Sequence, residues 1–177
     1  MSVANRRTWR TWRSTGRRPA LQVQAHNSSV PPPYWLGVTA AHMLDLSEFK
    51  TSKLPTRPSE LAPDGSAVRP LLGLPGGSMA HFELPAAETS RAVVHRTVGE
   101  LWFVLSGRGE LWRKRGTREE VVVLEPGACV TLPQGTHFQF RASPGEALAI
   151  IAATIPRWPG GSEAEFVRGP WASSAAQ

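Results

Sequence analysis

Short apolar or alternating runs, each ended by glycine, proline or charged residues, dominate the chain from about Ser66 onward. Side chains at every second position of such a run share one face, which is the periodicity of a β-strand. Turn signals such as Pro126-Gly127 separate the runs. The pattern predicts nine strands: Ala67–Leu72, Ser78–Leu84, Ala92–His95, Glu100–Leu105, Gly109–Arg113, Glu119–Leu124, Cys129–Leu132, Phe138–Ala142 and Ala147–Thr154.

Many short strands without a helical stripe predict an all-β sandwich or barrel. The run Glu100–Leu105 is apolar on both faces apart from Glu100, so we expect a central strand that is buried on both sides. A carboxylate there must be paired, hydrogen-bonded or bound to metal, because an unpaired buried charge is costly. We expect His81 to be exposed or at a sheet interface, and Cys129 to be a small core residue.

Two stretches of this region resemble the two characteristic motifs of the cupin superfamily. The first is Ala87-x5-Val93-x-His95-x4-Glu100-x6-Gly107, and the second is Gly127-x5-Pro133-x-Gly135-x-His137. The family motifs read Gly-x5-His-x-His-x3,4-Glu-x6-Gly and Gly-x5-Pro-x-Gly-x2-His-x3-Asn. The resemblance covers about residues 65–156 and implies a jelly-roll barrel, also called a double-stranded β-helix.

The resemblance also implies a divalent metal, commonly iron, manganese, nickel or zinc, held inside the barrel by three histidines and one glutamate. Carried over by position, His95, Glu100 and His137 match three of these ligands, and Val93 stands where the other histidine would be. His137 follows Gly135 one residue earlier than in the motif. An ungapped alignment therefore puts Phe138 in the ligand position, and a shift of one residue moves a side chain to the opposite face of a strand.

Two imidazoles and one carboxylate are the facial triad of non-haem iron oxygenases, and with water they also suit catalytic zinc. This metal centre requires that all three side chains point inward and converge on one ion. The alternative is a metal-free barrel in which Glu100 hydrogen-bonds to His95 or His137. We expect Glu100 to be the catalytic residue, and we expect the substrate pocket to be lined by Trp102, Val104, Gln139 and Val93.

The leading hypothesis is a metal-dependent enzyme that acts on a small organic molecule by oxygen insertion or isomerisation. The other hypothesis is a non-catalytic small-molecule-binding or sensor barrel without metal. The single cysteine excludes an intramolecular disulfide framework. The apolar run 147–155 is too short to span a bilayer, which needs about twenty residues. We therefore expect a cytoplasmic protein without a membrane partner, and the resemblance implies a homodimer.

The net charge of +6 comes entirely from the N-terminal third, since residues 1–53 hold eight Lys/Arg and two Asp/Glu. We predict a disordered basic arm over residues 1–53, a barrel domain over 54–172 and a flexible tail over 173–177. The arm has three open interpretations: a transit peptide, a nucleic-acid-binding segment with Trp9 and Trp12 between arginines, and a dispensable extension upstream of Met43. We favour the extension and do not expect nucleic acid as a partner.

Two further tryptophans, Trp158 and Trp171, follow the last predicted strand and lie among prolines and glycines. They predict a C-terminal segment that packs over the barrel. The sequence leaves open whether this segment closes the pocket, covers a sheet edge or contacts a second subunit.

Overall fold

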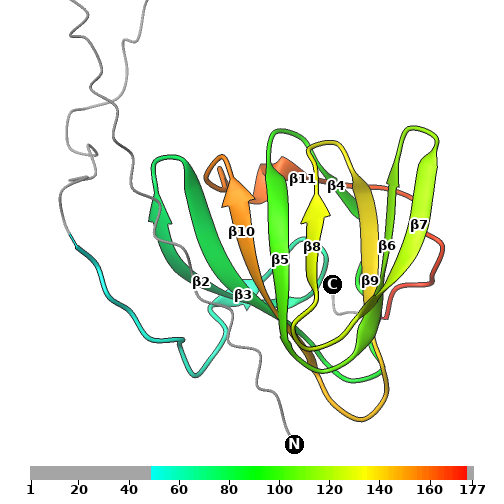
Figure 1. Cartoon of the computed structure of the whole chain (residues 1–177), viewed down its shortest axis with the longest axis horizontal. Coiled ribbons are helices and arrows are strands. Elements are labelled where there is room, and N and C mark those ends of the chain that lie inside the picture. The colour runs from blue at the N-terminus through cyan, green and yellow to red at the C-terminus, as the bar shows by residue number, and fades with distance from the viewer. Residues whose placement is uncertain (1–48, 175–177) are drawn as a thin grey trace, which may run out of the picture. The chain divides into compact units, whose positions relative to one another are not determined.

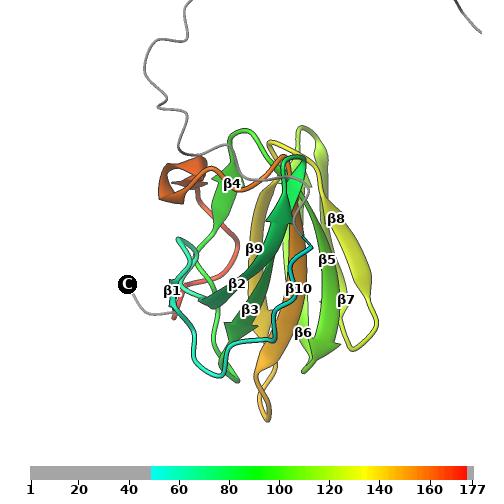
Figure 2. The ribbon, with the colours of Figure 1, turned by 90° about the vertical axis from the view of Figure 1, so that its left-hand side faces the viewer.

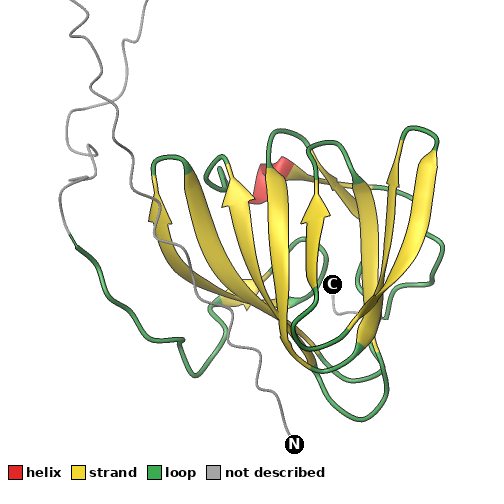
Figure 3. Cartoon of the chain, in the orientation of Figure 1, coloured by secondary structure: helices red, strands yellow, loops and turns green. Residues whose placement is uncertain are grey.

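The computed structural model describes residues 49–174, so the interpretations of the basic arm, including the start at Met43, lie mostly outside the described residues. These residues form an all-β structure with one short 3-10 helix, Gly161–Glu163 (Figure 3). The strands are β1 Glu60–Leu61, β2 Ala67–Leu74, β3 Gly77–Leu84, β4 Val93–His95, β5 Gly99–Ser106, β6 Gly109–Arg115, β7 Arg118–Leu124, β8 Cys129–Leu132, β9 His137–Ala142, β10 Leu148–Ile155 and β11 Ala164–Phe166.

The strands pair into two antiparallel sheets that pack face to face as a jelly roll, as predicted (Figure 1). One sheet has the strand order β1-β2-β3-β10-β5-β8, and the other has the order β11-β4-β9-β6-β7. Figure 2 shows the segment after β10, including the 3-10 helix, beside β4. No helix within residues 49–174 has the length and apolar character needed to cross a membrane.

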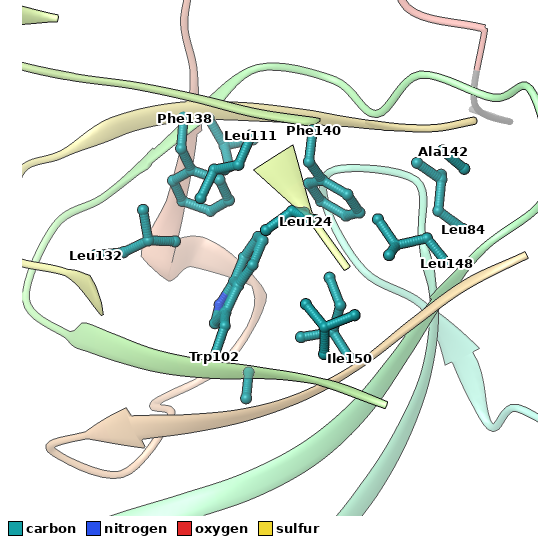
Figure 4. Close-up of a cluster of buried hydrophobic side chains, with 13 residues drawn as sticks. Leu84, Trp102, Leu111, Leu124, Leu132, Phe138, Phe140, Ala142, Leu148 and Ile150 are labelled. Atoms are coloured by element: carbon teal, nitrogen blue, oxygen red, sulfur yellow. The ribbon is translucent and has the colours of Figure 1, made fainter. Parts of the chain in front are cut away.

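The core lies between the sheets and is built from the inward-facing residues of each strand (Figure 4). Trp102 of β5 packs edge-on against Phe138 and Phe140 of β9, with ring centroids 5.5 and 5.2 Å apart. Such edge-to-face pairs stabilise a core beyond the area that they bury. These contacts join the two sheets and fix which side of β9 faces inward.

All nine predicted strands occur, and their ends differ from the predicted ends by at most two residues. The strands that the pattern did not predict are β1 and β11. They contain two and three residues, which is too short for alternation to give a signal. Both belong to the outer ends of the sheets, where β1 pairs with β2 and β11 pairs with β4.

The prediction that Glu100–Leu105 is buried on both faces is wrong. The strand lies between β10 and β8, but Leu101 and Phe103 on its outer face are 45% and 46% exposed. Cys129 pairs with Phe103 and is also exposed, so it is not a core residue. The reason is the same in each case, since only the inner face of this sheet packs against the other sheet.

His81 of β3, which we expected to be exposed or at a sheet interface, is buried. Its Nδ1 atom lies 3.3 Å from a guanidinium nitrogen of Arg69 on the neighbouring strand β2. Arg69 also forms an ion pair with Glu83. This polar cluster occupies the outer face of the sheet, so it contributes nothing to the interior of the barrel.

Ala87 adopts a left-handed backbone conformation with φ of 64°, and it stands where the first sequence motif has glycine. It is the third residue of a turn closed by the bond from the Glu88 amide to the Pro85 carbonyl. Positive φ at this turn position favours glycine, because a side chain there costs about 1–2 kcal/mol. The glycine of the motif therefore marks a left-handed backbone conformation, which this chain adopts with alanine although glycine is favoured there.

We expect Ala87→Gly to raise the free energy of unfolding by about 0.5–1 kcal/mol, since relief of the left-handed strain exceeds the entropy that glycine adds to the unfolded chain. The matched control is Ala86→Gly in the same turn, where φ is not positive; it should lower stability by about 0.4–1 kcal/mol. Chemical denaturation followed by circular dichroism measures both effects. Equal destabilisation by the two substitutions would contradict the assignment.

Candidate functional site

A pocket of about 500 Å³ reaches into the barrel. Its apolar wall comes from both sheets and includes Val68, Phe82, Val93, Trp102, Phe138, Phe140 and Ile150. Its polar groups include Asp64, Ser78, His95, Glu100, Thr154 and Arg157. A mostly apolar cavity with a few convergent polar groups is the usual form of a small-molecule site.

Glu100 lies on the inner face of β5, two residues before Trp102, and is only 6% exposed. The indole Nε1 of Trp102 donates a 2.7 Å hydrogen bond to its Oε2 atom. Burial raises the pKa of Glu100 to about 8, although the bond from Trp102 opposes this shift. The carboxyl group is therefore mostly protonated at neutral pH, which meets the expectation that a buried acid avoids an unpaired charge.

His95 is the last residue of β4, and its ring is enclosed by two aromatic rings. It packs edge-on against Phe138 and Trp158, with centroids 5.1 and 5.0 Å away. Burial lowers the pKa of His95 to about 4, against the opposing charge of Glu163, so the imidazole is neutral at neutral pH. Its Nδ1 atom lies 3.7 Å from Oε1 of Glu100, which is close but beyond hydrogen-bond distance.

The structure does not bring His137 to this pair. Phe138 and Phe140 of β9 lie in the core, so alternation places His137 and Gln139 on the outer face of the same strand. Phe138 thus occupies the inward position, as in the ungapped alignment. The predicted convergence of His95, Glu100 and His137 is corrected accordingly, and residues 49–174 contain no group of three or more His, Cys, Asp or Glu side chains that could hold a metal ion.

The donor set therefore does not fit the divalent metal that the sequence motifs imply. Two of the implied ligand positions hold Val93 and Phe138, which are apolar and line the pocket. Of the two carboxyl oxygens of Glu100, Oε2 already accepts a hydrogen bond from the Trp102 indole. What the pocket offers instead is the carboxyl group of Glu100 beside the imidazole of His95 in an aromatic enclosure.

Two of the four predicted pocket residues line the pocket, and two do not. Val93 and Trp102 line the pocket, whereas Val104 is fully buried in the core cluster. Gln139 lies outside the barrel and is buried under the C-terminal segment. The prediction for Gln139 assumed that His137 points inward. Because the two residues share one face of β9, both point outward.

The segment after β10 supplies pocket residues that sequence reasoning did not assign to the site. Trp158, Gly161 and Ala164 line the pocket, and Asp64 from the β1–β2 turn does so as well. The only sequence signal for this wall was the pair of tryptophans among prolines and glycines. Trp158 does reach the pocket, but Trp171 packs elsewhere.

Gln139 anchors the far end of the same segment. Its Nε2 donates to the carbonyl oxygens of Ser90 and Trp171, and its Oε1 accepts from the Trp171 amide. Gly169 lies so close that an added Cβ would be 2.2 Å from Oε1 of Gln139. The Arg141 guanidinium lies 4.4 Å from the Trp171 ring centroid. The outer face of β9 thus binds the C-terminal segment.

Comparison with known proteins supports the fold. Residues 80–154 match the family model described as a cupin domain. The solved structure of recombinant oxalate oxidase in complex with glycolate is 19% identical, with a TM-score of 0.56 over 66% of this chain and 62% of that chain. The matched region thus spans less than two thirds of oxalate oxidase. None of the curated proteins matches the sequence.

Two other solved structures give a similar picture. Peruvianin-I, a cysteine peptidase from Thevetia peruviana latex, is 16% identical, with a TM-score of 0.53 over 62% of this chain and 71% of that chain. Streptomyces PAC13 (H42Q) with uridine is 13% identical, with a TM-score of 0.52 over 67% of this chain and 92% of that chain. At these identities the likeness shows a shared fold alone.

The pKa of Glu100 predicts a pH dependence of stability. The folded pKa of about 8 exceeds the reference value of 4.5, so the folded state retains a proton that the unfolded chain releases. This contribution to stability is lost as pH rises, by up to about 1.4 kcal/mol per pH unit. His95 acts in the opposite direction, but only between about pH 4 and its reference pKa of 6.5.

We therefore expect the free energy of unfolding to fall by about 2 kcal/mol from pH 6.5 to 8.5 in the wild type, and Glu100→Gln to remove this fall. Urea denaturation at each pH gives the measurement. Glu119→Gln is the control, because the pKa of Glu119 is lowered by its bonds to Trp112 and Lys114 and does not titrate in this window. A slope that persists in Glu100→Gln would contradict the assignment.

The ligand geometry also predicts metal content. After incubation with iron, manganese, nickel or zinc salts, the purified protein should retain far less than one ion per chain, because His137 faces away from Glu100. Plasma mass spectrometry after gel filtration measures the content. One ion per chain, lost in both His95→Ala and His137→Ala, would show that the three residues do converge.

Proposed function

This chain is a member of the cupin superfamily, and we propose that its barrel binds a small, largely apolar organic molecule and moves a proton on it, with Glu100 and His95 as the acid–base pair. The observation that carries the proposal is the placement of these two groups side by side in a pocket of about 500 Å³ lined by aromatic rings. Proton transfer is the step that isomerisation requires.

The pocket wall favours an apolar or aromatic ligand body. Phe82, Phe138, Trp102 and Trp158 offer ring faces and edges, so a planar molecule can exchange water for stacking contacts. Two of the similar solved structures, oxalate oxidase with glycolate and PAC13 with uridine, hold small organic molecules. Those ligands support small-molecule binding by this fold and do not identify the ligand of this chain.

The hydrogen bond from Trp102 determines which oxygen of Glu100 can donate. Because the Trp102 indole N–H bonds to Oε2, the proton of the neutral acid belongs on Oε1, the oxygen nearer to His95 Nδ1. A ligand atom can lie about 2.8 Å from both Oε1 and Nδ1, since these atoms are 3.7 Å apart. Glu100 would then donate a proton to a ligand carbonyl oxygen while the neutral imidazole of His95 removes a proton from the carbon next to that carbonyl. This converts the ketone into its enol and leaves an imidazolium beside a carboxylate.

The apolar enclosure sets the protonation state of both groups at neutral pH, and the lowered pKa of His95 also makes its imidazole a weaker base. A carboxylic acid that is still protonated near neutral pH, beside an imidazole that is unprotonated, can donate and accept in the same encounter. Positioned acid–base groups contribute about 10²–10⁴-fold to a reaction rate. No step is assigned to a metal, because the residues present do not form the implied ligand set.

Binding without catalysis is the alternative function that the sequence leaves open, and one experiment separates the two. Ligands are first selected by thermal shift from a panel of small aromatic and cyclic carbonyl compounds. Each ligand is then incubated with the protein in D2O, and loss of its C–H signals is followed by proton NMR. A protein that moves a proton at carbon exchanges it with solvent deuterium.

We expect Glu100→Gln to slow the exchange at least 100-fold while the ligand dissociation constant changes only a few-fold. His137→Gln is the matched control, since this histidine lies on the outer face of β9 and should leave the exchange unchanged. Binding without exchange in the wild type would favour the non-catalytic function. If no member of the panel stabilises the protein, the proposal of an organic ligand of this class fails.

The homodimer implied by the family resemblance belongs to this proposal as well. The exposed Leu101 and Phe103 on the outer face of β5 are consistent with a subunit contact. Light scattering at several concentrations tests it. The cytoplasmic location is likewise retained as a proposal.

A further inference from the structure

We propose that Glu163, in the C-terminal segment, is the positioning residue of the Glu100–His95 pair: it holds the loop that joins the two strands carrying these groups. The inference rests on the proposed function for its catalytic consequence. Its structural content can be tested without a ligand.

The loop consists of residues 96–98, between the end of β4 at His95 and the start of β5 at Gly99. All three loop amides bond to the same residue. The Thr97 and Val98 amides both donate to Oε1 of Glu163, the latter at 2.9 Å. The Thr97 hydroxyl donates to Oε2 at 2.8 Å, and the Arg96 amide donates to the Glu163 carbonyl. One side chain thus satisfies donors that would otherwise have no partner in the loop.

His95 depends on this support because β4 is short. The pairing of β4 with β9 ends at Val94, and the strand partner of His95 is Ala164 of β11, directly after Glu163. On the other side, the Gly135 amide donates to the His95 carbonyl. The orientation of the imidazole toward Glu100 is therefore set in large part by the segment that Glu163 anchors.

Glu163 is built for a charged role. It is only 4% exposed, and burial opposes its ionisation, but the bonds from Thr97 and Val98 outweigh this and hold the pKa of Glu163 below its usual value. Hydrogen bonds to an ionised carboxylate are shorter and stronger than neutral ones. The loop is consequently held by a stiff contact, and the Glu163 charge also acts on His95.

The same segment forms part of the pocket wall through Trp158, Gly161 and Ala164. Trp158 packs edge-on against the His95 ring. The C-terminal segment around Glu163 therefore supports two features: the pocket wall against which a ligand would bind, and the loop that sets the spacing of Glu100 and His95. A change at Glu163 should alter the geometry of the pair before it alters the barrel itself.

The experiment compares Glu163→Gln and Glu163→Asp with the wild type, and includes Glu163→Ala as the truncation of the side chain. Glutamine keeps the shape but removes the charge and one acceptor, and aspartate keeps the charge but is too short to reach all three donors. Two-dimensional proton–nitrogen NMR then monitors the indole N–H of Trp102, which bonds to Glu100. The indole N–H of Trp112, which bonds to Glu119, serves as the internal reference.

Both variants should shift the Trp102 indole resonance and leave that of Trp112 in place. With a ligand that exchanges in the wild type, both should slow deuterium exchange more than 10-fold while the dissociation constant changes less than 3-fold, and Glu163→Asp should retain more activity than Glu163→Ala. The matched control is Glu165→Gln, since Glu165 is two residues along the same segment and forms an exposed ion pair with Arg96. It should change neither readout.

A folded Glu163→Gln or Glu163→Asp with an unchanged Trp102 resonance and unchanged exchange would overturn the proposal, and a lowered melting temperature alone would show a purely structural role. If the wild type exchanges no ligand, the catalytic part of the proposed function fails. In that case the Trp102 resonance still decides on Glu163: a shift supports its positioning role, and no shift removes it.

Discussion

Strand β9 presents Phe138 and Phe140 to the interior and His137, Gln139 and Arg141 to the exterior, and this orientation determines which of its side chains line the pocket. It is fixed by the pairing of β9 with β6 and by the edge-on packing of the two phenylalanine rings against Trp102. Because alternation is strict, a shift by one residue would exchange the two sets of side chains. The barrel would then contain an imidazole and an amide in place of two aromatic rings.

The inward phenylalanines explain why the pocket contains neutral groups. Glu100 and His95 are surrounded by apolar rings, and each is driven toward its uncharged form by burial, the acid upward in pKa and the imidazole downward. The outward residues have an equally definite use, since Gln139 and Arg141 bind the C-terminal segment through Trp171. One strand therefore sets the polarity of the pocket on one face and holds part of its cover on the other.

The sequence was sufficient for an all-β sandwich or barrel, because nine short runs separated by turn residues predict many strands, and the resemblance of its two motifs to those of cupins implied the jelly roll. It was also sufficient to single out His95, Glu100 and Trp102, which share a face or a motif spacing. It was not sufficient for His137, since the second motif is one residue short and strand register depends on long-range pairing. The predicted burial of Leu101 and Phe103 is wrong, because an apolar pattern along a strand does not show whether a second layer covers that face of the sheet. Glu163 carried no local signal, as its partners are 65 and 66 residues away.

That separation has a consequence for shortened forms of the protein. A chain cut after β10 would keep strands β2–β10 but lose Trp158, Glu163 and β11. Its β4–β5 loop amides would have no acceptor, and its apolar pocket would lack one wall. Exposed apolar surface of this kind makes partly folded chains prone to aggregation.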